Sequence, residues 1–123
     1  MAPSKQERRT SPRIAHNVPV KITQENGDIV TETVNISRSG AYCRVNRHIE
    51  PMTKLKIHLL LPIKKNDKIT TKKVSCQGVI VRSESISNGK EFNVAIFFND
   101  ITHNDAEIIA DYISSYLEKE ASS

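Results

Sequence analysis

The sequence predicts a mainly β fold, an antiparallel barrel or sandwich that is closed by one carboxyl-terminal helix. Two observations predict it. Between residues 18 and 98, short segments in which apolar and polar residues alternate are separated by turn signals. After residue 102, the apolar residues recur instead at the spacing of one helical face. With 123 residues, of which 37% are hydrophobic, the chain is long enough for one domain with a single small core.

The first segment, residues 1–14, is expected to form a flexible basic arm, because it is polar, contains prolines and shows no periodicity. Residues 1–21 carry five Lys or Arg side chains and one acid, Glu7. Such a segment suggests an anionic partner, which leaves phosphates, nucleic acid and membrane surfaces open. The folded domain is expected over residues 15–118, with residues 119–123 as a tail.

Six strands are expected within the domain. The alternation is clearest in residues 54–61, where every second residue is leucine or isoleucine and the residues between include lysine and histidine. Pro62 is expected to end that strand, and residues 64–68 to form a charged turn. Asn26-Gly27 is a typical hairpin dipeptide. The expected strands are residues 18–22, 29–36, 41–45, 54–61, 72–82 and 92–98.

The carboxyl end is expected to form one amphipathic helix. Thr102 is placed like an N-cap residue and Asp105 like its N3 partner, a variant of the capping box. The carboxylates of this segment are expected on the solvated face and near the positive end of the helix dipole. The apolar face comprises Ile108, Ile109, Tyr112, Ile113, Tyr116 and Leu117.

Enzymatic and metal-binding functions have little support in the sequence. The four histidines, at positions 16, 48, 58 and 103, do not have the HxxxH or HExxH spacing of metal ligands, and no Gly-rich phosphate loop is present. Cys43 alternates with apolar residues of the inward face, so a core cysteine is expected rather than a nucleophile. Because there is no CxxC pair, apolar leader or apolar run long enough to span a bilayer, a cytoplasmic protein without cofactor or membrane span is expected.

Three arginines, Arg8, Arg9 and Arg13, lie just before the first expected strand. A guanidinium group binds phosphate oxygens in a bidentate manner, pairs with O6 and N7 of guanine, and stacks on a purine face. One residue type can therefore recognise both the phosphate and the base of a nucleotide. A solvated basic arm is the alternative interpretation.

A second group of polar residues, Asn35-Ile36-Ser37-Arg38-Ser39-Gly40, falls where one expected strand ends and the next begins. Its composition is that of an ordinary turn. Strand periodicity nevertheless places Asn35 and Ser37 on the same face, where an amide and a hydroxyl can bind a base edge or a sugar-phosphate. Gly40 is expected to permit a positive φ and a close approach of the backbone to a ligand.

Together these residues resemble the motifs of the PilZ domain family. The segment from Arg9 to Arg13 is similar to the family's RxxxR motif, and the segment from Asn35 to Gly40 is similar to its (D/N)xSxxG motif. The resemblance extends through the later strands to the final helix. The chain departs from the pattern at Ala95, where many members have glycine, and this concerns barrel packing more than ligand contact.

The resemblance implies a six-stranded antiparallel β-barrel with a carboxyl-terminal helix, and cyclic di-GMP as the ligand on the outer face of the barrel. It implies that Arg9 and Arg13 engage phosphates and guanine edges, that Asn35 and Ser37 contact a guanine, and that Gly40 shapes the turn. An arginine at position 8 resembles the pattern of members that bind two intercalated ligand molecules.

The predicted function is that of a bacterial cyclic di-GMP receptor or adaptor, which signals to an unidentified effector protein through ordering of the arm. One alternative is a PilZ-like protein-interaction module that does not bind the nucleotide. A nucleic-acid-binding barrel is a third interpretation and predicts aromatic residues interleaved with basic ones. Only Tyr42 stands near Arg44 and Arg47, so no nucleic-acid partner is expected.

Overall fold

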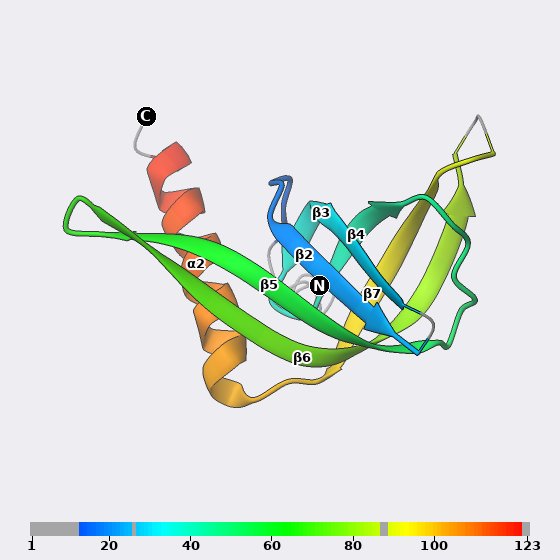
Figure 1. Cartoon of the computed structure of the whole chain (residues 1–123). Coiled ribbons are helices and arrows are strands. Elements are labelled where there is room, and N and C mark those ends of the chain that lie inside the picture. Colours follow the sequence, from blue (N-terminus) through cyan, green and yellow to red (C-terminus); the bar gives the residue numbers. More distant parts are fainter. Residues whose placement is uncertain (1–12, 26, 87–88, 122–123) are drawn as a thin grey trace, which may run out of the picture.

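The computed structural model describes residues 13–25, 27–86 and 89–121. Arg8 and Arg9 lie outside the described residues. The strands are β1 (Arg13–Ile14), β2 (Pro19–Gln24), β3 (Gly27–Ser37), β4 (Gly40–Val45), β5 (Lys54–Lys65), β6 (Lys68–Ser85) and β7 (Phe92–Asp100), and the helix is α2 (His103–Ala121) (Figure 1).

The strands β3, β2, β5, β6, β7 and β4 form a continuous antiparallel sheet in that order, and β4 pairs again with β3. This last pairing closes the sheet into a ring, so the prediction of a six-stranded antiparallel barrel with a carboxyl-terminal helix is confirmed. The short β1 pairs with the end of β3 that β2 leaves free.

The core fills the barrel with the inward residues of each strand, as the period-two alternation requires. The odd-numbered residues of the segment 55–61 are all buried, and Ile109 and Ile113 of α2 join the same cluster. Cys43 is fully buried, and this burial raises the pKa of its thiol to about 12. The expectation of a core cysteine is therefore confirmed.

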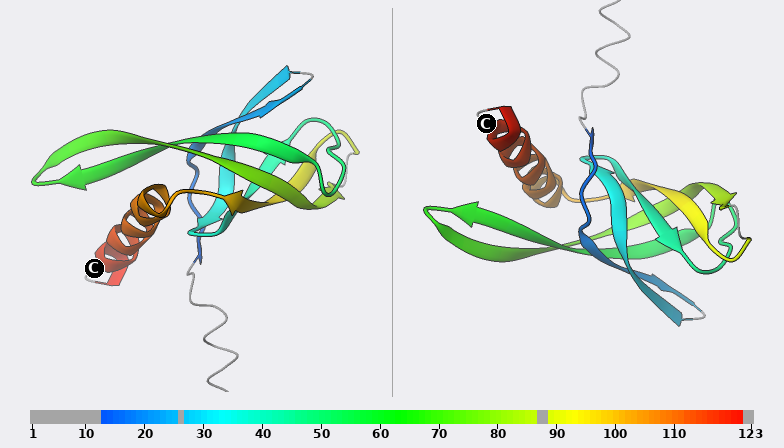
Figure 2. Two further views of the ribbon diagram at one scale, coloured as in Figure 1. Left: turned by 90° about the horizontal axis from the view of Figure 1, so that it is seen from below. Right: turned by 90° about the horizontal axis from the view of Figure 1, so that it is seen from above.

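Strands β5 and β6 form a hairpin that is longer than predicted and extends past the barrel beside α2 (Figures 1 and 2). The prediction that Pro62 ends the strand is wrong, since β5 continues to Lys65 and pairs with β6 throughout. Pairing of β2 with β5 stops at Leu59, so one side of β5 is open at Pro62. A proline without an N–H group is tolerated on such an open edge.

The amino-terminal boundary also differs from the expected one. Arg13 and Ile14, assigned to the arm from the sequence, form β1, and Ile14 belongs to the core. Close by, His16 stacks on the ring of Tyr112 and shares a hydrogen bond with its hydroxyl group. The start of the described chain is therefore attached to both the barrel and α2.

The helix begins as the sequence predicts. The backbone N–H of Asp105 donates a hydrogen bond of 3.1 Å to Oγ1 of Thr102, which is the expected cap. The helix continues to Ala121, three residues beyond the predicted end of the domain at position 118.

Candidate ligand-binding site

The end of β3 carries Asn35 and Ser37, and a β-bulge precedes them. Thr33 pairs with Cys43 of β4 but Asn35 pairs with Tyr42, so Val34 is the extra residue. A bulge re-aims the side chains that follow it. After this bulge, Asn35 is half-buried and Ser37 is buried.

Arg13 joins the two polar residues of the β3 end. Its Nη1 donates a hydrogen bond of 2.5 Å to Oδ1 of Asn35, and its Nη2 lies 3.5 Å from Oγ of Ser37. Residue 13 pairs with residue 37 across β1 and β3, which brings the guanidinium group to this position. The structure therefore brings together Arg13, Asn35 and Ser37, which the sequence assigns to two separate motifs.

Ser37 also organises the turn between β3 and β4. Its Oγ accepts a hydrogen bond of 3.3 Å from the backbone N–H of Ser39 and donates one of 3.3 Å to the carbonyl oxygen of Gly40. A hydroxyl group that satisfies backbone groups in this way fixes the turn. Ser37 is only 1% exposed, so its main contacts are within the protein.

Gly40 is required for a different reason from the one expected. The positive-φ glycines of the described chain are Gly27 and Gly89, so the expectation of a positive φ at Gly40 is wrong. A Cβ atom at Gly40 would lie 2.4 Å from the carbonyl oxygen of Ile96 in β7. The glycine therefore permits the close approach of two strands directly behind the turn.

An open cavity of about 500 Å³ lies on the outer side of the barrel next to these residues. Val81 and Phe97 give it an apolar surface, since they are 54% and 48% exposed. Arginine side chains lie at this apolar surface, an arrangement that suits a ligand with flat rings and phosphates. The lining residues are Arg13, Asn35, Ser39, Gly40, Ala41, Tyr42, Val81, Arg82, Ala95, Ile96 and Phe97.

Sequence reasoning missed the contribution of β6 and β7 to this cavity. Arg82 is paired with Glu84 at 3.8 Å, and the hydroxyl group of Tyr42 donates a hydrogen bond of 3.1 Å to the same carboxylate. A signal was present, because Val81 and Phe97 occupy outward positions of their strands, where polar residues are usual. Exposed apolar residues at such positions indicate a binding surface.

Arg38, at the centre of the second motif, takes no part in the cavity. Its Nη2 lies 3.0 Å from the carboxylate of Glu107, and this ion pair links the turn to α2. Both side chains are about half exposed, so the pair adds little to the free energy of unfolding. Its role is to orient the turn relative to α2.

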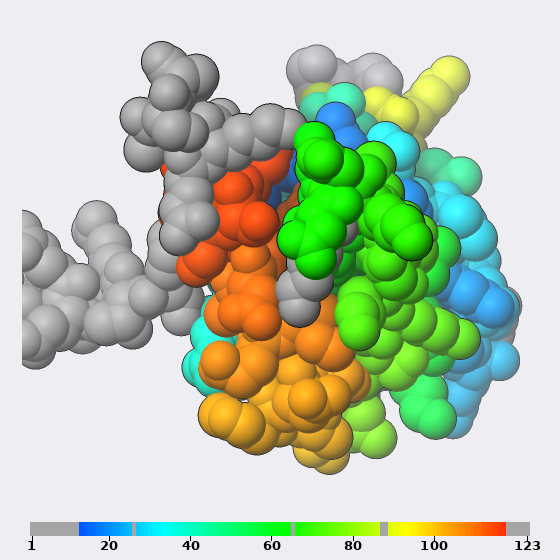
Figure 3. Space-filling model, turned by 90° about the vertical axis from the view of Figure 1, so that its left-hand side faces the viewer, coloured from blue at the N-terminus to red at the C-terminus, as the bar shows by residue number. Residues whose placement is uncertain are grey.

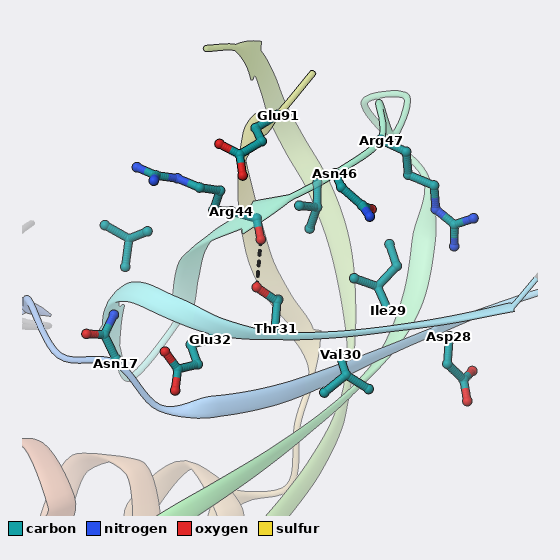
Figure 4. A pocket seen from close by; sticks show the side chains of 12 residues that line it. Asn17, Asp28, Ile29, Val30, Thr31, Glu32, Arg44, Asn46, Arg47 and Glu91 are labelled. Carbon is teal, nitrogen blue, oxygen red and sulfur yellow. Dashed lines mark hydrogen bonds between the residues drawn. The ribbon is translucent and has the colours of Figure 1, made fainter. Parts of the chain in front are cut away.

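A larger cavity, of about 750 Å³, lies where β3 and β4 separate (Figure 4). The two strands are bridged there by a hydrogen bond of 2.7 Å from Oγ1 of Thr31 to the carbonyl oxygen of Arg44. Asp28, Glu32 and Glu91 contribute three carboxylates to its lining, against the two guanidinium groups of Arg44 and Arg47. The lining therefore has a net negative charge, which disfavours an anionic ligand. None of the predicted site residues that the structure describes lines it, so the cavity at Arg13 is the better candidate.

Among the described residues, no group of three or more His, Cys, Asp or Glu side chains is arranged to hold a metal ion. In the same part of the chain, no helix has the length and apolar character needed to cross a membrane.

Comparison with protein families places these features in context. The family model of the PilZ domain matches residues 7–115. The chain belongs to the PilZ domain family. PilZ domains are known as receptor modules for cyclic di-GMP. No curated protein matches this chain.

The solved structures that share this fold include the following two. The Bacillus subtilis inhibitor of motility, MotI/DgrA, has a TM-score of 0.76 and 19% sequence identity, and the match covers 90% of this chain and 52% of that one. The chain therefore spans about half the length of that protein. The PilZ domain of YcgR from Escherichia coli, whose structure contains c-di-GMP, has a TM-score of 0.59 and 11% identity over 93% of this chain and 94% of that one.

Proposed function

We propose that this PilZ protein is a bacterial receptor or adaptor for cyclic di-GMP, which binds in the cavity beside Arg13. The observation that carries the proposal is the contact of one guanidinium group with both Asn35 and Ser37, residues 22 and 24 positions further along the chain. These residues lie beside a cavity of about 500 Å³, a volume typical of small-molecule sites.

Each side chain has a role that its chemistry supports. Arg13, already held by Asn35, presents N–H groups to a phosphate or to O6 and N7 of a guanine. The exposed face of Phe97 offers a surface on which a base can stack. Asn35 recognises a base edge when ligand replaces part of its contact with Arg13. Arg9, outside the described residues, supplies a second guanidinium group to the phosphates.

Two ligand molecules are expected per chain, and Arg8 accounts for this ratio. Two stacked cyclic dinucleotides bring four phosphates together, and their mutual repulsion must be neutralised. A third guanidinium group supplies part of the missing positive charge and covers an exposed guanine.

Binding is converted into a signal by ordering of residues 1–12 on the ligand, and an effector protein reads the ordered arm in the cytoplasm. The ligand can shift the equilibrium toward the ordered arm only if it binds that state more tightly than the state without it. The alternative, a PilZ protein-interaction module that does not bind the nucleotide, is favoured by the contact between Arg82 and Glu84, since a carboxylate of the protein already pairs with one of the two arginines that line the cavity.

Calorimetric titration with cyclic di-GMP tests the proposal, with GMP, GTP and cyclic di-AMP as controls. A dissociation constant in the low-micromolar range or tighter is expected, about −8 kcal/mol or better. Cyclic di-AMP is expected to bind far more weakly, because adenine has an amino donor where guanine has the O6 acceptor. Equal heats for the two cyclic dinucleotides, or no heat with cyclic di-GMP, would reject the proposed function.

A further inference from the structure

A second surface of the barrel combines positive charge with exposed apolar side chains. It is formed by the outward side chains of β2, β3, β5 and β6, and we call it the lysine face. The residues that define it are Lys21, Val30, Lys56, His58, Leu60 and Lys73.

Strand pairing places these residues side by side. Lys21 pairs with Val30 on one neighbouring strand and with His58 on the other, and Leu60 pairs with Lys73. Along β5, the outward positions alternate with the buried leucines and isoleucines of the core. The charges lie close enough to affect each other, since partial burial and then Lys73, Lys21 and Lys56 lower the pKa of His58.

The centre of the lysine face is apolar and hollow. Val30 is 79% exposed and Leu60 is 43% exposed, which is unusual for large aliphatic side chains in a barrel wall. With Pro19 and Val20 they line a cavity of about 410 Å³, and Lys21, His58 and Lys73 lie around it. The carboxylate of Asp28 is 3.5 Å from Nζ of Lys21 and offsets part of that charge.

The lysine face lies across the barrel from the candidate ligand site. The strands β2 and β5 are at its middle, whereas the cavity beside Arg13 is built mainly on β4 and β7. In the ring order β3-β2-β5-β6-β7-β4, these two pairs of strands are on opposite walls. The β5–β6 hairpin also extends from this wall beyond the barrel (Figure 1), and Figure 3 shows the end of the hairpin beside α2. Residues 54–73 of this hairpin contain seven lysines and one carboxylate, Asp67.

We propose that the lysine face is a docking surface for an acidic segment of a partner protein, with an apolar side chain of that segment seated between Val30 and Leu60. Protein interfaces combine an apolar, desolvated centre with a charged rim, and this face has that arrangement. Carboxylates on the partner would complement Lys21, Lys56 and Lys73 and increase the rate of association.

Other anionic partners fit the face less well. The bases of nucleic acids are recognised through arginine forks and stacked aromatic rings, whereas the cations here are lysines with His58 and the centre is aliphatic. A bilayer accepts protruding apolar groups, whereas Leu60 and Val30 line a hollow. A hollow of this kind instead receives the anchoring side chain of a protein.

The docking surface does not require nucleotide at the Arg13 cavity, so its test is independent of the proposed function. In living cells of the native host, p-benzoylphenylalanine in place of Leu60 is used for photo-crosslinking, and the same substitution at Leu117, which is 36% exposed on α2, serves as control. We expect a discrete protein adduct at position 60, with the cross-link mapped by mass spectrometry to a segment rich in Asp and Glu. Arg13→Ala is expected to leave the adduct unchanged.

Charge reversal with the purified partner completes the test. Lys73→Glu and Lys56→Glu are each expected to lower the affinity at least tenfold, and a Glu→Lys change in the partner segment is expected to restore it. Lys68→Glu, which alters the same net charge, is the matched control. Side chains alternate along β6, so Lys68 lies on the side of Thr70 and Lys72, which face α2. Lys73 lies on the opposite side, which belongs to the lysine face.

Three results would overturn the proposal. The first is the absence of a protein adduct at position 60. The second is an affinity for the partner that does not change in Lys56→Glu and Lys73→Glu. The third is that these two variants lose binding only to a 20-base-pair DNA duplex or to phosphatidylglycerol vesicles, and not to the partner protein. If cyclic di-GMP fails to bind while the adduct persists, only the proposed receptor function is rejected.

Discussion

Substitution of Gly40 by alanine tests how the turn between β3 and β4 is built. The new Cβ atom would lie 2.4 Å from the carbonyl oxygen of Ile96, against a limit of about 3.0 Å that real Cβ contacts respect. Relief therefore requires a shift of about 0.6 Å, the difference between these two distances, in paired backbones that cannot rotate away. Overpacking of this kind costs about 2–3 kcal/mol of the free energy of unfolding.

That loss corresponds to a fall of roughly 10 °C in the melting temperature of a domain of this size. Gly78→Ala is the matched control, because its Cβ atom would meet the same residue at a distance of 2.8 Å, but at the side-chain atom Cγ2. The shift needed to reach 3.0 Å is about 0.2 Å there instead of 0.6 Å, so a smaller loss of about 1 kcal/mol is expected. Thermal unfolding followed by circular dichroism measures both variants.

The reasoning is refuted if Gly40→Ala melts within about 2 °C of the wild type, a shift smaller than a loss of ~1 kcal/mol would produce. It is also refuted if Gly78→Ala is the more damaging change. A variant that expresses only as aggregate is compared with Gly78→Ala by urea unfolding after refolding. Equal midpoints would then show that the strands can separate without loss.

Four further predictions concern the site and the core. Arg13→Ala is expected to weaken cyclic di-GMP binding by about 2–4 kcal/mol in calorimetry with little change in melting temperature, and unfolding of the barrel would show a structural role instead. Arg8→Leu is expected to reduce the ligand-to-protein ratio from two toward one, and a ratio of one in the wild type would contradict this. Saturating ligand is expected to protect the peptide bonds after Arg8 and Arg9 from trypsin, and an unchanged digestion pattern would argue against arm ordering. Because burial raises the pKa of Cys43 to about 12, the folded thiol stays protonated at pH values where the unfolded thiol, with its ordinary pKa of 9.0, ionises. The free energy of unfolding is therefore expected to fall as the pH rises from about 9 toward 12, less steeply in Cys43→Ala, and equal slopes in urea unfolding would disprove this.

The sequence was sufficient for features that depend on local pattern. The alternation in residues 54–61 predicted a half-buried strand, and the spacing of Thr102 and Asp105 predicted the helix cap. It failed at Pro62, where the effect of proline depends on how far β2 extends along β5. It also missed β1, whose two residues form a strand only because they pair with the end of β3.

The part of the site that lies in local sequence motifs was predictable, and the part that strand pairing assembles was not. Arg13, Asn35 and Ser37 belong to motifs that are local in sequence, and the structure places their side chains in contact. Arg82 and Phe97 enter the cavity through the pairing of β7 with β4 and β6, and this register is a property of the closed barrel. No short segment of the sequence contains it.

Anchoring of Arg13 in β1 has a consequence for the arginines that precede it. Arg9 is four residues away in the sequence, so the covalent chain limits the separation of the two Cα atoms to about 14 Å whatever the conformation between them. So short a tether confines Arg9 near the cavity at an effective concentration in the millimolar range or above. If cyclic di-GMP binds as proposed, its phosphates recruit a tethered guanidinium group instead of one from solution. The anchor at residue 13 then reduces the loss of entropy in this step.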